Sequence, residues 1–434
     1  MRLKFRTIRS LAAIVLVTPA SADLIYSNFQ NIAIPATYDG VYLNVETGAW
    51  NTNLSSPVSG WDINPYFGGS TVWNSPSFQP VRSGTGELDA VLNLAAGTTV
   101  SSGSVFSTSI QGPTGENPGG PSYGGSDTHM GNGADQFASG SEGYLGFRLN
   151  GTNYGSMRVV FTNNTSGAYI KDWAYDTSGA PVVVGAIQQV GQNIVMSSGF
   201  TLASALNNSG GTTNLIKNGS GINILSATST YTGTTTVNEG TLLINGSTDA
   251  ASTVSVASGA ILGGTGTING AVSVSGSLSP GAGIETFATG ALSFNNDSFL
   301  VHQLDSSVLK PVGSDLLKVT GNLALAERVG LSLSDLGGTD VAFDVGDIFS
   351  LINYTGTWNG GLFTLGGNEL ADDEEFTFSL NTWRISYNDA VGGTNYSGEF
   401  AGGTDSFVNL HVIPEPRAAL LSALSLLLLL RRKV

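Results

Sequence analysis

Between residues 200 and 290, hydrophobic and polar positions alternate with a period of two over short stretches, as in TVSV and AVSV. Such alternation is typical of strands with one buried face, so Val should point into a core and Ser or Thr toward solvent. Glycine separates these stretches, and because Gly adopts positive φ without steric cost, we expect it at the corners between strands. The expected strands are Thr234–Val237, Thr241–Ile244, Thr253–Val256, Gly266–Ile268 and Ala271–Val274. The expected corners are Gly233, Gly240, Gly246, Gly259, Gly264, Gly270 and Gly276.

Short strands joined by frequent corners predict a right-handed parallel β-helix over residues 191–290. A single rung of such strands cannot bury its apolar face, whereas stacked rungs bury a continuous apolar column. A β-sandwich built from strands of the same length is the alternative that this pattern leaves open.

The segments on either side of the predicted β-helix also predict β structure, which makes the body of the protein all-β. Residues 23–190 are richer in aromatic residues and predict a separate, jelly-roll-like β-sandwich. Two antiparallel hairpin strands are expected where apolar positions recur, at Tyr144, Phe147 and Leu149 and then at Met157, Val159 and Phe161. Residues 291–411 should complete or cap the solenoid, because an open rung would expose unpaired edge groups.

Composition and charge narrow the chemistry that the chain can carry. The absence of Cys among the 434 residues excludes a disulfide framework, a Cys-ligated zinc and a thiol nucleophile. The formal net charge is −15, and between residues 23 and 414 nine Lys and Arg stand against 31 Asp and Glu. Such an acidic surface repels nucleic acid, which is therefore not an expected partner.

Residues 1–22 have the pattern of a secretory signal peptide. Basic residues precede the apolar stretch LAAIVLV, and Ala20-Ser21-Ala22 forms a small-residue cleavage pattern. We therefore expect export through the Sec machinery, with cleavage between Ala22 and Asp23.

A second apolar segment, residues 418–430, predicts a short C-terminal helix. As a helix it would extend roughly 20 Å, against a bilayer hydrocarbon core of about 30 Å. The basic residues 431–433 would hold that end on the cytoplasmic side. We therefore expect only transient insertion into the inner membrane.

The whole ending, residues 412–434, resembles the PEP-CTERM sorting signal of Gram-negative bacteria. The resemblance rests on Pro414-Glu415-Pro416, the leucine-rich segment, and the basic end with Arg431 and Arg432. In that family an exosortase recognises the PEP motif, cuts the chain and passes it to the cell surface or extracellular matrix. An ordinary membrane anchor at the C-terminus is the alternative.

Residues Gly221–Leu242, with TYTGTTTVNEGTL at their centre, are similar to the autotransporter-associated β-strand repeat. That repeat occurs in β-helical passenger domains. The resemblance therefore implies a passenger-like β-helix.

Few residues of the predicted β-helix could carry catalysis. Enzymes that act on polysaccharides need facing carboxylates or a basic residue beside them. Between Ile222 and Gly290 the charged residues are Glu239, Asp249 and Glu285, and no spacing marks a pair among them. We predict no catalytic residue, so the protein is expected not to be an enzyme.

Two motifs outside the predicted β-helix are best interpreted as loops. Gly120-Pro121-Ser122-Tyr123-Gly124 matches G-x-S-x-G, but Pro121 and the surrounding glycines do not predict the strand and helix of a nucleophile elbow. Asp127, His129 and Asp135 could face an ion, yet their spacing is not that of a zinc or calcium site. We predict no metal and no cofactor.

Aromatic residues in the N-terminal part are candidates for glycan binding, because aromatic faces stack on pyranose rings. The candidates are Trp50, Trp61, Tyr66 and Trp73. Packing into the core of the β-sandwich is the alternative for all four.

Together these features predict an exported, non-enzymatic surface or extracellular-matrix protein. Its role would be structural or adhesive, in contact with extracellular polysaccharide. A carbohydrate-binding or polysaccharide-processing β-helix protein is the alternative.

Overall fold

The computed structural model describes residues 23–85, 89–106, 130–307, 313–337, 342–393 and 405–414. Within these ranges the chain consists of strands, with a single 3₁₀ turn at Phe67–Gly69 and no α-helix, which confirms the all-β class. No helix in the described part of the chain is long and apolar enough to cross a membrane. The predicted signal peptide and the predicted helix 418–430 lie outside the described residues.

The chain divides into two compact units between Thr232 and Gly233. This division falls inside the predicted β-helix. The domain limits expected at residues 190 and 290 remain predictions.

The N-terminal unit begins with a β-sandwich of two antiparallel sheets. The larger sheet has the order β7-β9-β10-β11-β1, with β2 also paired to β11, and the smaller sheet has the order β4-β3-β5-β6. The larger sheet comprises β1 (Asp23–Tyr26), β2 (Ile32–Ile34), β7 (Phe78–Pro80), β9 (Glu142–Leu149), β10 (Asn153–Val160) and β11 (Ala168–Asp176). The smaller sheet comprises β3 (Tyr42–Leu43), β4 (Trp50–Asn51), β5 (Ile63–Tyr66) and β6 (Thr71–Asn74).

Both sheets bury alternate residues in one shared core, as expected for a sandwich. Ile63 and Val72 come from the smaller sheet, whereas Phe147 and Val159 come from the larger one. The predicted hairpin is confirmed, because β9 and β10 pair antiparallel. Tyr144 differs from the expected pattern, since its hydroxyl bonds to Gln188 instead of entering this core.

The N-terminal unit also contains the first parallel strands. Strand β1 pairs antiparallel with β11 on one side and parallel with β15 on the other, so the sandwich sheet continues into a parallel stack. Parallel pairing continues from β15 to β17 and from β14 to β16. The remaining strands of this unit are β8 (Thr99–Val100), β12 (Val182–Val183), β13 (Ile187–Val190), β14 (Asn193–Met196), β15 (Phe200–Leu202), β16 (Asn214–Lys217) and β17 (Ile222–Leu225).

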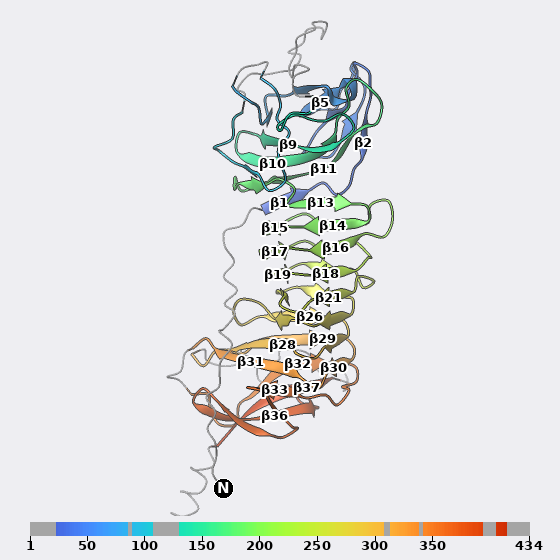
Figure 1. Cartoon of the computed structure of the whole chain (residues 1–434). Helices are drawn as coiled ribbons and strands as arrows, with labels where there is room; N and C mark the ends of the chain where they lie inside the picture. Colours follow the sequence, from blue (N-terminus) through green and yellow to red (C-terminus); the bar gives the residue numbers. More distant parts are fainter. Residues whose placement is uncertain are drawn as a thin grey trace, which may run out of the picture. The chain divides into compact units, whose positions relative to one another are not determined.

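The C-terminal unit is a parallel β-helix built from three sheets (Figure 1). The first sheet stacks β18 (Thr235–Val237), β21 (Val254–Val256), β24 (Val272–Val274), β27 (Leu292–Phe294) and β30 (Leu323–Leu325). The second stacks β19 (Thr241–Ile244), β22 (Ile261–Gly263), β25 (Ser277–Ser279), β28 (Phe299–Leu304), β31 (Val329–Asp335) and β33 (Phe363–Leu365). The third stacks β20 (Ser247–Thr248), β23 (Thr267–Ile268), β26 (Thr286–Thr289), β29 (Leu316–Val319) and β32 (Ile348–Tyr354).

Columns of identical or similar apolar residues fill the interior of this β-helix. In the second sheet a leucine of each rung pairs with a leucine of the next, and all of them are buried. This column is Leu242, Leu262, Leu278, Leu300 and Leu331. Each such side chain contributes about 1.5–3 kcal/mol when it is fully removed from water. The rungs thus bury their Val and Leu side chains and direct Ser or Thr outward, as the alternation predicted.

Glycine serves two different physical needs at the corners. Gly240, Gly259 and Gly264 have positive φ, as expected. At Gly270 and Gly276 the requirement is space, because a Cβ would lie 2.0 and 2.2 Å from a carbonyl oxygen of the preceding rung. The expectation that positive φ explains every corner was therefore wrong at these two positions, and it was also wrong at Gly233 and Gly246, whose φ is not positive.

Antiparallel strands follow the last parallel rungs. Strand β37 (Ser406–Ile413) pairs antiparallel with β32, and β36 (Asn381–Asp389) and β35 (Glu375–Phe378) extend the same sheet. Strand β34 (Asn368–Glu369) forms a hairpin with β33 on the second sheet. These strands cover edge groups that an open rung would leave unpaired.

Candidate functional site

A shallow groove of about 450 Å³ runs over the outer face of the first sheet of the C-terminal unit. Outward side chains of five stacked strands line it. These outward side chains are small, whereas the inward positions of the same strands hold larger apolar residues. Representative lining residues are Thr236, Thr253, Ser255, Ser273, Ser293 and Ala324. This groove is the candidate functional site, and we name it the hydroxyl groove.

Hydroxyls from four of the five rungs form a straight column along the hydroxyl groove, and Ala324 of β30 continues it without a hydroxyl. Thr236 pairs in register with Ser255, Ser255 with Ser273, and Ser273 with Ser293. Neighbouring strands in a sheet lie about 4.8 Å apart, so the hydroxyls repeat at this spacing. Within the described ranges, the hydroxyls of Thr236 and Ser255 have no hydrogen-bond partner, whereas Ser273 accepts a bond from Asn295 Nδ2 at 3.2 Å.

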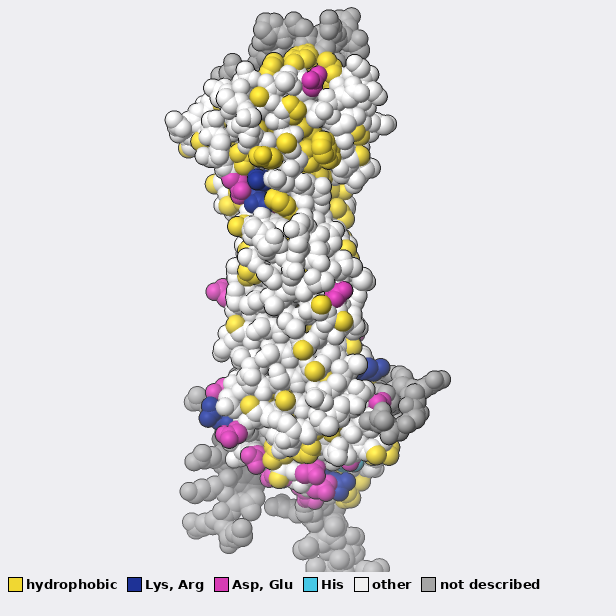
Figure 2. Space-filling view, turned by 90° about the vertical axis from the view of Figure 1, so that its right-hand side faces the viewer, with side chains coloured by type: hydrophobic (Ala, Val, Ile, Leu, Met, Phe, Trp, Pro, Cys, Tyr) yellow, Lys and Arg dark blue, Asp and Glu magenta, His cyan; other side chains and the backbone are white. Residues whose placement is uncertain are grey.

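The lining of the hydroxyl groove carries no charged side chain among the described residues. Figure 2, which shows the side on which Figure 1 labels β18 and β21, has few charged side chains over its middle part. The groove is thus an uncharged surface on a chain whose net charge is −15. Its hydroxyls can donate and accept hydrogen bonds, and its methyl groups can contact the CH groups of a ligand. These are the contacts that an uncharged sugar chain makes.

The acidic residues considered for catalysis lie in three different loops, after β18, after β20 and before β26. Glu239 is exposed in the turn after β18. Asp249 follows β20, where its carboxylate accepts the backbone N–H of Ala251 at 2.8 Å and so orders its own loop.

Two of the three histidines lie in the described part of the chain, in different surroundings. His302 is buried in β28, its Nε2 lies 2.7 Å from Ser314 Oγ, and burial lowers the pKa of His302 to about 3. His411 on β37 is half-buried and forms a cluster with Ser386 and Asp389 of β36. His129 and Asp127 lie outside the described residues, as does Gly120–Gly124.

Sequence reasoning did not find the cluster of Ser386, Asp389 and His411, because β37 and β36 are brought together only by sheet pairing. Its geometry differs from that of a nucleophile triad. Ser386 Oγ at 2.9 Å and Asp389 Oδ2 at 3.0 Å both contact the same nitrogen, His411 Nε2. In a triad the carboxylate holds the other ring nitrogen, which leaves Nε2 to take the proton of the serine. Among the described residues, no three His, Cys, Asp or Glu side chains lie together in a group that could hold a metal ion.

The four predicted glycan-binding aromatics occupy different environments. Tyr66 and Trp73 are buried, with ring centroids 4.7 Å apart. Trp61 is half-buried and packs edge-on against Tyr42 at 5.4 Å, whereas Trp50 is 47% exposed. Only Trp50 and Trp61 offer ring surface to solvent, and glycan stacking on them remains a prediction.

The residues predicted for processing lie at the two ends of the described chain. Asp23 begins β1, and its backbone N–H donates to the carboxylate of Asp176 at 2.6 Å. Ala20 and Ala22 precede the described residues. Pro414 follows β37, while Glu415, Pro416, Arg431 and Arg432 lie outside the described residues.

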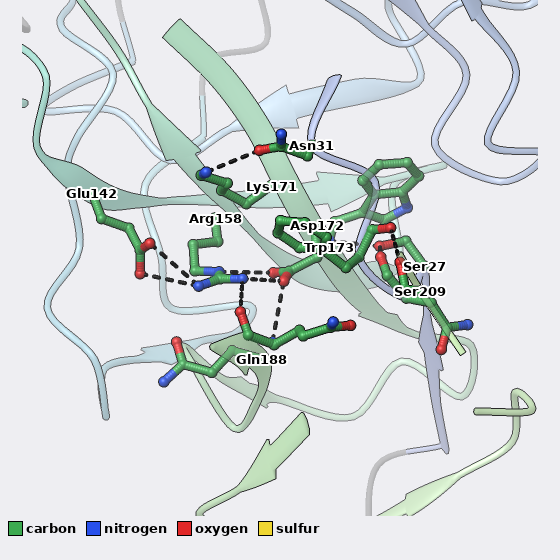
Figure 3. A network of polar contacts seen from close by, with 12 residues as sticks. Ser27, Asn31, Glu142, Arg158, Lys171, Asp172, Trp173, Gln188 and Ser209 are labelled. Carbon is green, nitrogen blue, oxygen red and sulfur yellow. Dashed lines mark hydrogen bonds and ion pairs between the residues drawn. The ribbon is translucent and has the colours of Figure 1, made fainter. Parts of the chain in front are cut away.

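A buried ion pair joins the sandwich to the first strands of the solenoid in the N-terminal unit (Figure 3). Arg158 Nε donates to Asp172 Oδ1 at 3.1 Å, and Nη2 donates to the carbonyl of Gln189 on β13. Tyr26 donates to Asp172, and the exposed side of the network is closed by Glu142. Burial raises the pKa of the Asp172 carboxyl. Burial by itself would lower the pKa of Arg158, but the hydrogen bond and ion pair with Asp172 outweigh it and raise that pKa. This network has a structural role.

Comparison with known protein families identifies one segment. The family model of the passenger-associated-transport-repeat matches residues 215–244, which run from within β16 to the end of β19. This match confirms the similarity of this segment to the repeats of autotransporter passengers and extends it beyond the 221–242 predicted. No curated protein matches the chain.

Proposed function

We propose that this chain is an exported, non-enzymatic protein of the cell surface or extracellular matrix that contacts extracellular polysaccharide. The observation that carries the proposal is the passenger-associated-transport-repeat at residues 215–244 within a chain of stacked parallel strands. Repeats of this kind are named for passengers, the parts of autotransporters that are carried outside the cell. The non-enzymatic role is supported by the hydrogen bonds of Ser386 and Asp389, which converge on one nitrogen of His411.

The proposed route begins with the signal peptide and ends with an exosortase. After Sec export, residues 418–430 hold the chain briefly at the inner membrane, and the exosortase cuts near Pro414-Glu415-Pro416. The support is the order of motif, apolar segment and basic end in the sequence.

We expect mass spectrometry of the released protein to find its C-terminus near Pro416. Replacing all three residues of the PEP motif with Ala should keep the chain, with Arg431 and Arg432 attached, in the membrane fraction. A strain that lacks the exosortase is the control and should retain the parent chain in the same way. Released protein that still ends in Arg431-Arg432-Lys433-Val434 contradicts processing.

The hydroxyl groove supports contact with a neutral, extended glycan. A pyranose unit in such a chain is about as long as the spacing of about 4.8 Å between rungs, so successive sugars could meet successive hydroxyls. We expect the affinity for β-1,4-linked glucose oligomers, measured by calorimetry, to rise from cellobiose up to about four sugars, because four rungs of the groove present a hydroxyl.

A bulky substitution in the hydroxyl groove tests this contact. Ser255→Trp should weaken cellohexaose binding at least about tenfold, or 1.4 kcal/mol. The matched control is Thr286→Trp, which places the same side chain at an exposed position of another sheet and should leave binding unchanged. Equal effects of the two substitutions, or tighter binding of a galacturonate hexamer than of cellohexaose, would contradict this use of the groove.

A further inference from the structure

We propose that signal-peptide cleavage creates an ion pair at a buried carboxylate, in which the new α-ammonium group of Asp23 binds the carboxylate of Asp176. The proposal rests on the export proposed above, with cleavage between Ala22 and Asp23. Hydrolysis of that peptide bond by a signal peptidase consumes one water, leaves a carboxylate on Ala22 and leaves an ammonium group on Asp23.

The carboxylate of Asp176 is fully buried and accepts hydrogen bonds from backbone N–H groups. Asp176 lies at the end of β11 and is 0% exposed. Its Oδ1 accepts the backbone N–H groups of Ser178 at 2.9 Å and Ala180 at 2.6 Å. Within the described ranges no Lys, Arg or His pairs with it. A buried carboxylate without a cation is costly, whereas pairing with a charged donor offsets that cost.

The nitrogen of Asp23 already lies where this cation is needed. It is 2.6 Å from Asp176 Oδ2, while the side chain of Asp23 points outward and is exposed. The backbone on both sides of this contact is held in place. Thr177 N donates to Asp23 O at 3.1 Å, and β1 pairs with β11 and β15 on its two edges. Cleavage would therefore change the charge at this nitrogen without requiring the strand to move.

The pair has a pH dependence with a definite sign. An α-amino group ordinarily has a pKa of about 7.7–8.0, and a carboxylate at hydrogen-bond distance raises it. The charged groups at the amine are Asp176 and the carboxylate of Asp23 itself, because β15 and residues 177–180 contain no charged residue. The other charged residues of β11 bond elsewhere, Lys171 to Asn31 and Asp172 to Arg158. While the carboxylate of Asp176 is ionised, the stabilisation is thus complete below about pH 7.7 and is lost as the pH rises through the raised pKa of the amine.

The test compares two full-length exported chains, one beginning at Asp23 and one carrying Gly-Ala before Asp23. The extended chain keeps the Asp23 amide but moves the ammonium group away. We expect the pH dependence of N-terminal acylation, followed by mass spectrometry, to give an amine pKa about one unit higher in the chain that begins at Asp23. In that chain Asp176→Asn should return the amine to its ordinary range, and Asp23→Asn, the control for the exposed carboxylate, should not.

Stability provides an independent measurement. Asp176→Asn should change the unfolding equilibrium constant about tenfold more in the chain that begins at Asp23 than in the extended chain. Equal amine pKa values in the two chains, or an equal effect of Asp176→Asn on both, would overturn the ion pair. A natural N-terminus at another residue would also overturn it, and would leave the proposed export untouched.

Discussion

Arg158→Ala is expected to lower the free energy of unfolding of the N-terminal unit by about 3–5 kcal/mol, because it leaves the buried Asp172 carboxylate without its cation. Arg158 is 4% exposed and Asp172 is 2% exposed, so water cannot replace the lost bonds. The carbonyl of Gln189 would lose a charged donor in the same change. Urea unfolding with hydrogen exchange on peptides of β10, β11 and β13 would measure the loss and locate it.

Two further variants separate this effect from a general loss of positive charge. The exposed pair of Arg328 and Asp297 has two bonds of 2.9 Å, and Arg328→Ala should change stability little because solvent screens that pair. The double variant Arg158→Met with Asp172→Leu should recover much of the loss, since it removes both buried charges together. A single Arg158→Ala variant as stable as the parent would show that the network does not support the junction between β10, β11 and β13.

Gly270→Ala is expected to destabilise the C-terminal unit by about 1–3 kcal/mol. The added Cβ would lie 2.0 Å from the carbonyl oxygen of Ser252 in the preceding rung, and backbone cannot move aside as a side chain can. The stack must therefore open locally between these two rungs. Hydrogen exchange of the peptides around Ser252 and Gly270 should show faster exchange there than in the parent.

Gly283→Ala is the matched control for that change. Nothing lies within 4 Å of the position of its Cβ, and its φ is not in the left-handed region. The Ala variant should be unchanged or slightly more stable, because Ala restricts the unfolded chain more than Gly does. If both variants lose the same stability, the cost comes from removing glycine in general, and the steric explanation for Gly270 is wrong.

The β-helix was predictable because its determinants are local. Alternation over four residues sets which side of a strand faces inward, and rungs of similar length place like residues above one another. The strands expected at residues 234–237, 241–244 and 253–256 accordingly coincide with β18, β19 and β21 to within one residue. The aromatic residues were less predictable, since Trp50 and Trp73 look alike in the sequence and only the packing of the two sandwich sheets buries one of them.

The sequence by itself determined the all-β class, the inward and outward faces of the rungs, the passenger-like repeat and the acidic balance of the chain. Each of these follows from neighbours in the chain or from composition, which do not depend on how distant segments meet. Only the tertiary structure decided the residues that act together, such as Asp23 with Asp176 and Arg158 with Asp172. Residues 153 positions apart come within 2.6 Å because β1 pairs with β11. Strand pairing over such separations depends on the free energy of the whole sheet, which no local pattern of side chains specifies.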